Sequence, residues 1–75
     1  MNKVRLNKIS NIRSEIETLR DNLQGLYEEE QEYYDNMPES LQSSERGERS
    51  EECQDAMDYA LDTLNEVIDK LDEIL

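Results

Sequence analysis

Carboxylates are the most abundant groups in this chain that could do chemistry, since 20 of its 75 residues are Asp or Glu. Neighbouring acids such as Glu28-Glu29-Glu30 and Glu51-Glu52 raise the question of catalysis, which needs two carboxyls with separated pKa values. Adjacent residues on a helix point in different directions, and a thin helical protein has little volume for a pocket. The chain has no His, the usual general base and a common zinc ligand. We therefore expect no catalytic centre, no metal site and no cofactor.

The single cysteine, Cys53, cannot form a disulfide within the chain. Its neighbours Glu51, Glu52 and Asp55 are acidic, whereas a reactive thiolate needs electropositive surroundings. The sequence therefore favours a small buried hydrophobic residue over a redox centre. A lone cysteine also suits a reducing compartment.

The most regular pattern of acids is in the last third of the chain. Steps of three and four residues would bring a carboxylate to one outward side of a helix about every 5 Å, comparable with the roughly 3.4 Å spacing of phosphates along a nucleic-acid strand. One interpretation is a solvated surface that aids solubility; the other is a ridge that binds a Lys- and Arg-lined channel, with Tyr59 as an aromatic anchor. Taken by itself, Tyr59 is more simply interpreted as a partly exposed helix residue. This candidate partner-binding set, the acidic ridge, consists of Glu48, Glu51, Asp55, Asp58, Tyr59, Asp62, Asp69 and Asp72.

Charge is unevenly distributed along the chain. The net charge is −12 and the pI is about 4.1, yet residues 1–20 carry +3 and residues 21–75 carry −15. The acidic part would repel phosphates, so we expect no direct binding to nucleic acid and instead a protein partner with a basic surface. No apolar run is long enough to cross a membrane and no secretory segment is apparent, so we expect no membrane association.

Two segments repeat apolar residues in steps of three and four, the heptad spacing of paired helices. Composition alone leaves folding in doubt, because only 16 of 75 residues are Leu, Ile or Val, close to the roughly 20% typical of disordered chains. Each segment also has a third apolar column, with Tyr27 and Tyr34 in the first and Leu61, Ile68 and Leu75 in the second. The predicted helix-packing core is Ile9, Ile12, Ile16, Leu19, Leu23, Leu26 and Tyr33, with Cys53, Met57, Ala60, Leu61, Leu64, Val67, Ile68, Leu71 and Ile74.

Pro38 separates the two segments, because it lacks an amide hydrogen and biases Met37 away from helical angles. We expect one domain with helices at about 3–36 and 44–74 and a loop at about 37–43. Ser43-Ser44 is a candidate N-cap for the second helix, with Ser50 as the alternative. Gly25 is interpreted as a tolerated surface glycine in preference to a site of close approach.

The predicted fold is all-α, an antiparallel two-helix hairpin that places the basic start of the first helix beside the acidic end of the second. A stripe of three columns is wider than one helix pair covers, so we expect a homodimer that completes a four-helix bundle. A bundle completed by a different protein is the alternative.

The stretch from Glu30 to Gln42, which contains Tyr33-Tyr34-Asp35-Asn36-Met37-Pro38, and the following Ser44–Glu48 resemble small acidic helical proteins of bacteriophages, prophages and other mobile elements. The resemblance implies a bacterial cell. With the lone cysteine, which suits a reducing compartment, we expect a cytoplasmic location. It also implies a phage-encoded inhibitor that occupies a nucleic-acid site on a host defence or nucleic-acid-processing protein. Together with the charge pattern, it predicts a non-enzymatic interaction protein, an acidic nucleic-acid mimic; the alternative is a structural oligomerisation adaptor with no electrostatic target.

Overall fold

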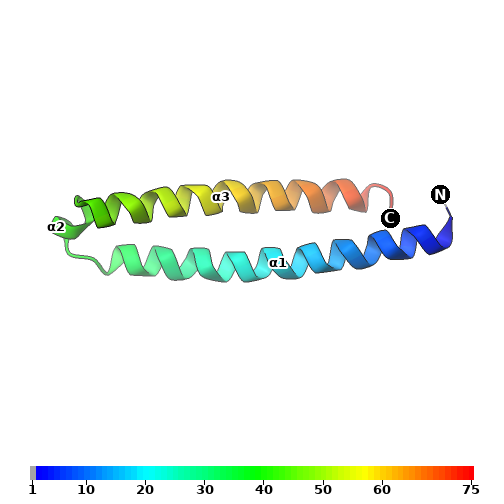
Figure 1. Cartoon of the computed structure of the whole chain (residues 1–75), viewed down its shortest axis with the longest axis horizontal. Coiled ribbons are helices and arrows are strands. Elements are labelled where there is room, and N and C mark those ends of the chain that lie inside the picture. Colours follow the sequence, from blue (N-terminus) through cyan, green and yellow to red (C-terminus); the bar gives the residue numbers. More distant parts are fainter. Residues whose placement is uncertain (1) are drawn as a thin grey trace.

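The computed structural model describes residues 2–75 and places them in three helices with no strand: α1 (Lys3–Asp35), α2 (Glu39–Gln42) and α3 (Glu45–Asp72). The prediction of an all-α protein is confirmed. The two long helices lie side by side and run in opposite directions, with the short α2 at the turn between them (Figure 1). The molecule is a rod of 58 × 14 × 13 Å.

Helix α1 begins with the side chain of Asn2, which accepts a hydrogen bond from the Arg5 amide at 2.8 Å and so satisfies one free amide of the first turn. It ends at Asp35, close to the predicted position, and Pro38 follows shortly after. Met37 is buried, with 9% of its surface exposed, because the chain turns around it. These residues fix the point where α1 ends and the chain reverses.

The turn contains a short helix that the sequence analysis assigned to a loop. Pro38 has φ −59°, an angle that its ring imposes, and its carbonyl accepts from the amides of Leu41 and Gln42 at 2.9 and 3.1 Å. Ser44 stands at the expected N-cap position of α3 but forms no side-chain cap; its hydroxyl donates instead to the Leu41 carbonyl. The Gln42 side chain donates to the Tyr34 carbonyl at 3.0 Å and ties the turn to the end of α1.

At Gly47 the turn leaves no room for a side chain. A Cβ atom there would lie 2.0 Å from the Gln42 carbonyl oxygen and 2.5 Å from its carbon, both backbone atoms. Gly25, by contrast, has nothing within 4 Å of a Cβ position and is exposed, in agreement with the interpretation of a surface glycine. The first turn of α3 therefore packs directly on the backbone that precedes it.

The contact between α1 and α3, here called the seam, buries fewer residues than the sequence predicted. Leu61 and Ile68 are the most buried hydrophobic residues, at 5% and 3% exposed. Both belong to the third column of α3, which therefore lies at the centre of the seam. Half-buried residues of the predicted core and of the third column on α1 complete it: Ile9, Ile16, Leu23, Tyr27 and Tyr34 on α1, and Met57, Leu64 and Leu71 on α3.

Six members of the predicted core are exposed, which corrects the predicted packing. Each helix carries three apolar columns, and a single neighbour covers only two of them. The third column of each helix is turned inward together with the column beside it on the helix surface, so the column at the far edge of the stripe is turned out. The exposed residues are Ile12 at 53%, Leu19 at 62%, Leu26 at 56%, Tyr33 at 48%, Val67 at 38% and Ile74 at 49%.

These exposed columns form one surface, the apolar flank, made of Ile12, Leu19, Leu26 and Tyr33 on α1 and Cys53, Ala60, Val67 and Ile74 on α3. Cys53 and Ala60 within it are half-buried. Four flank residues, Leu26, Tyr33, Ala60 and Val67, each precede a seam residue by one position. In an antiparallel pair such positions on the two helices lie on the same side of the seam. Tyr33 and Cys53 line the same groove, as this geometry requires.

Candidate interaction surfaces

All eight residues of the acidic ridge are exposed on α3. They lie on α3 because its sequence places acids at steps of three and four, away from the seam. Tyr59 is 77% exposed, the largest exposure among the exposed large hydrophobic residues. The structure thus places the whole predicted set on one exposed part of one helix.

Part of the acidic ridge lies next to the seam and is joined to α1 by polar contacts. Asp72 accepts two hydrogen bonds from the Arg13 guanidinium, at 2.9 and 3.1 Å. Glu51 accepts from the Tyr34 hydroxyl at 2.5 Å. These contacts connect residues 59 and 17 positions apart, so they help to hold the two long helices side by side.

Asn65, in the one gap of the ridge, makes a similar contact. It accepts from the Arg20 guanidinium at 2.9 Å, and Arg20 also pairs with its neighbour Asp21. Arg13, Arg20 and Tyr34 all reach across the seam toward the ridge. The apolar flank therefore lies on the opposite side of the α1–α3 pair from these contacts.

The middle of the ridge carries its charge without such partners. Within residues 2–75, no ion pair joins Asp55, Asp58 or Asp62 to a basic side chain. Like charges at this spacing repel one another and destabilise the helix slightly. This stretch is the part of the ridge most available to a basic partner.

The two polar contacts at the seam shift the pKa of their donors. The hydrogen bond to Glu51 raises the pKa of Tyr34 above its usual 10.0, with smaller contributions from desolvation and from the charges of Glu51 and Asp35. The hydrogen bonds to Asp72 and Glu17 raise the pKa of Arg13. Both shifts favour the protonated donor, which is the form that makes the contact.

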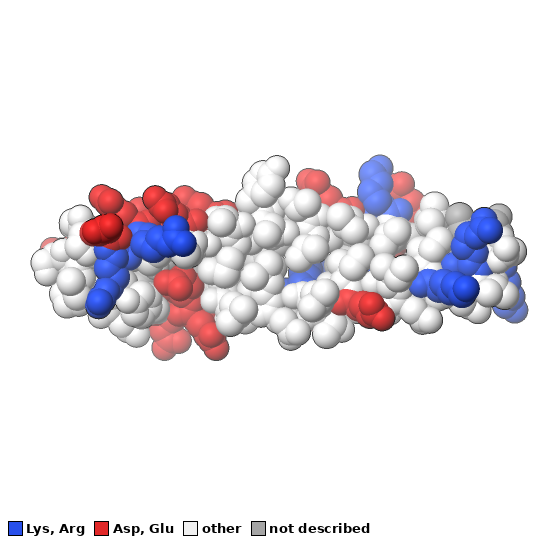
Figure 2. Space-filling view, in the orientation of Figure 1, with Lys and Arg blue, Asp and Glu red and all other residues white. Residues whose placement is uncertain are grey.

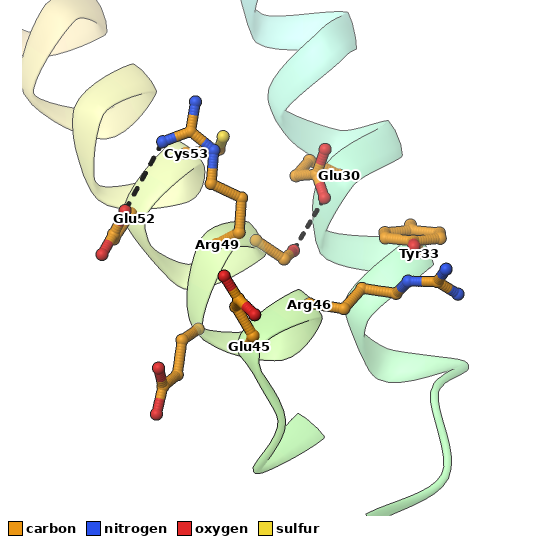
Figure 3. A pocket seen from close by; sticks show the side chains of 9 residues that line it. Glu30, Tyr33, Glu45, Arg46, Arg49, Glu52 and Cys53 are labelled. Atoms are coloured by element: carbon orange, nitrogen blue, oxygen red, sulfur yellow. Dashed lines mark hydrogen bonds and ion pairs between the residues drawn. The ribbon is translucent and has the colours of Figure 1, made fainter. Parts of the chain in front are cut away.

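A second candidate site is an open groove of about 750 Å³ at the turn end of the apolar flank (Figure 3). The Ser50 hydroxyl, on a residue only 3% exposed, donates to Glu30 at 2.7 Å, and Arg49 pairs with Glu52. Carboxylates outnumber cations here, so the groove suits a basic ligand. Its lining consists of Glu30, Tyr33, Glu45, Arg46, Glu48, Arg49, Ser50, Glu52 and Cys53.

The described part of the chain shows neither a cluster of metal ligands nor a membrane-spanning helix. No group of three or more His, Cys, Asp or Glu in residues 2–75 could hold a metal ion. None of the helices described is both long and apolar enough to cross a membrane. Comparisons with family models, with curated proteins and with solved structures found no match. The function must therefore be argued from the surfaces themselves.

Sequence reasoning missed two features of these surfaces. It did not find the close approach at Gly47, and it placed the flank residues in the core. The signal for the second was present, because a stripe of three columns is too wide for one helix pair. The sequence did not show which two of the three apolar columns on each helix face inward.

Proposed function

We propose that this protein is a non-enzymatic interaction module whose acidic ridge binds a basic groove on a protein partner, in the manner of a nucleic-acid mimic. The observation that carries the proposal is the exposed acidic ridge, whose central carboxylates have no basic partner within residues 2–75. A chain with net charge −12 is attracted to such grooves and repelled by nucleic acid itself.

The dimensions of the ridge support this kind of partner. Glu48 and Asp72 are 24 positions apart within the single helix α3, which corresponds to about 36 Å at 1.5 Å per residue. Carboxylates about every 5 Å could each meet a cation that otherwise contacts a phosphate, where phosphates follow at about 3.4 Å per strand. Tyr59, near the middle and largely exposed, supplies a flat apolar contact between the charges.

The resemblance to small acidic proteins of phages and mobile elements supports a bacterial host protein as the target. We propose a cytoplasmic encounter in a bacterial cell with a defence or nucleic-acid-processing protein, whose basic groove the ridge would occupy. Inhibition would then result from exclusion of the nucleic acid.

The test is capture of proteins from a bacterial lysate on the immobilised protein, followed by competition with duplex and single-stranded DNA. Wild type should capture a nucleic-acid-binding protein that either DNA or high salt releases. A variant with Asp55→Lys, Asp58→Lys and Asp62→Lys should lose that capture while keeping its helical circular dichroism. Equal capture by this variant, or capture that no nucleic acid competes, would contradict the proposal.

The matched control makes the same change in net charge at positions outside the ridge. Glu15→Lys, Glu28→Lys and Glu32→Lys together alter three exposed acids of α1 and raise the net charge by the same amount. Capture should persist in this control if position matters, and it should fall equally if only total charge matters.

A second function, self-association, is favoured by the apolar flank. Six large apolar side chains on this surface are 38% or more exposed, and contiguous patches of this kind mark interaction sites. We propose a homodimer that completes a four-helix bundle. It could serve as an oligomerisation adaptor if the ridge had no electrostatic target.

A further inference from the structure

We infer that the apolar flank is covered by a second copy of the chain lying antiparallel to the first, with the basic start of each α1 against the acidic turn end of the other copy. This inference rests on the proposed self-association and specifies its surface and orientation. It does not depend on any partner of the acidic ridge, which lies beyond the opposite edge of the seam except for Glu48, a residue that also lines the groove of the flank.

The first argument is the small core of a single copy. Among the described residues only Met37, Leu61 and Ile68 are buried hydrophobic residues. A chain of 75 residues with so little buried apolar surface needs a staple or a second copy for stability. The flank supplies the apolar surface that such a copy would cover.

The second argument is the size of that surface. The flank covers about 32 Å of the length of the rod, and a whole side of the rod measures 58 by 14 Å, or about 800 Å². Two copies placed face to face along their full length would bury up to about 1,600 Å², the size of a standard stable interface. A helical partner of different sequence could cover the same area, but it would need a matching length and charge pattern, which a second copy supplies automatically.

The third argument is the character of the residues beside the middle of the flank. Thr18, Asn22 and Gly25 on α1 and Ala56 and Thr63 on α3 are uncharged, small or short, and exposed. Gly25 has open space where a side chain would be, so a helix of another molecule could approach closely there. Figure 2 shows a side of the molecule with a mostly uncharged middle and charged side chains gathered toward both ends.

Charge then selects the orientation. Residues 28–52 contain ten acids and two arginines, a net charge of −8. A dimer with both turns at one end would bring two such regions together, which Coulomb repulsion disfavours. The antiparallel dimer separates them.

The opposite end of the rod provides the complementary charge. Lys3, Arg5 and Lys8 are exposed, and residues 2–8 contain no acid. α1 also extends beyond the end of α3 (Figure 1), so this basic segment projects past its own partner helix. In the antiparallel dimer it would lie by the groove near the turn of the other copy, where Glu30, Glu45 and Glu52 contribute acids.

Sedimentation equilibrium from 1 to 100 µM tests whether the second copy binds and where. Wild type should be a dimer at low micromolar concentration. Leu19→Lys and Leu26→Lys each place a charge on the flank and should weaken the dimer at least about tenfold. Ser14→Lys, an exposed position on α1 outside the flank, should leave it unchanged. A monomeric wild type would overturn self-association, and unaltered dimers in both leucine variants would overturn the choice of surface.

Distance measurement between spin labels tests the orientation without disturbing the flank by a charge. A Cys53→Ala, Ser40→Cys protein carries one label at the turn end of each copy, on an exposed residue of α2 that does not line the groove. The antiparallel dimer should separate the labels by about 50 Å along the bundle, whereas a dimer with both turns at one end leaves only the width of the bundle, about 20 Å. The short distance would overturn the inferred orientation while leaving self-association intact. This measurement also applies if the lysine variants fail to fold.

Discussion

The two glycines should respond to alanine with opposite signs, and the structure gives the reason. In Gly47→Ala the new Cβ would meet the Gln42 backbone at 2.0 Å from its oxygen and 2.5 Å from its carbon. Since neither atom belongs to a flexible side chain, α2 or the first turn of α3 must move. Overpacking of this kind typically costs 1–3 kcal/mol, and the better helix propensity of alanine, worth up to about 1 kcal/mol, offsets only part of it. We expect a net loss of up to about 2 kcal/mol in the free energy of unfolding.

Gly25→Ala is the matched control, because the same methyl group enters open space on an exposed part of α1. Only helix propensity changes there, so the free energy of unfolding should rise by up to about 1 kcal/mol. If a second copy approaches closely at Gly25, the gain should appear in a monomeric background such as Leu19→Lys and shrink in the dimer.

The assay is urea unfolding followed by circular dichroism, at one fixed protein concentration because self-association contributes to stability. For a domain of this size, 1 kcal/mol corresponds to a shift of about 4–8 °C in the melting temperature. If Gly47→Ala stabilises the protein as Gly25→Ala does, the start of α3 does not pack on Gln42 and the described turn is wrong.

Two further changes test the seam. Ile68→Ala should lower the free energy of unfolding by about 2–4 kcal/mol in the same urea assay, since the side chain is only 3% exposed and its loss leaves a cavity; a loss below 1 kcal/mol would contradict its burial. Because the pKa of Tyr34 is higher in the folded chain than the usual 10.0, its hydrogen bond to Glu51 contributes stability below pH 10 that is lost as the pH rises through the folded pKa. Stability should therefore fall less steeply above pH 10 in Tyr34→Phe than in wild type; equal slopes would argue against that bond.

The all-α class and the ends of the helices could be read from local signals. The periodic apolar residues indicate helices, and Pro38 ends the first of them wherever the remainder of the chain lies. The exposed ridge follows from the same periodicity, because acids such as Asp55 and Asp62 stand away from every apolar column. These features depend on residues that are close in sequence.

The inward columns and the turn could not be read in this way. Heptad spacing favoured Leu19 and Leu26 as core residues, whereas the structure turns them out and centres the seam on Leu61 and Ile68. That choice depends on how far each helix rotates about its axis, which is set by contacts between residues distant in sequence. The role of Gly47 likewise depends on where the turn places the Gln42 carbonyl, and the glycine alone does not reveal it.

The central claim is that the acidic ridge is a binding surface for a basic protein. Its most direct test is the affinity of a captured partner for the wild type and for the Asp55→Lys, Asp58→Lys, Asp62→Lys variant, measured over a range of salt concentrations. We predict that the wild-type affinity falls steeply as salt rises and that the variant binds weakly, with little dependence on salt. Equal affinities with equal salt dependence would contradict the claim.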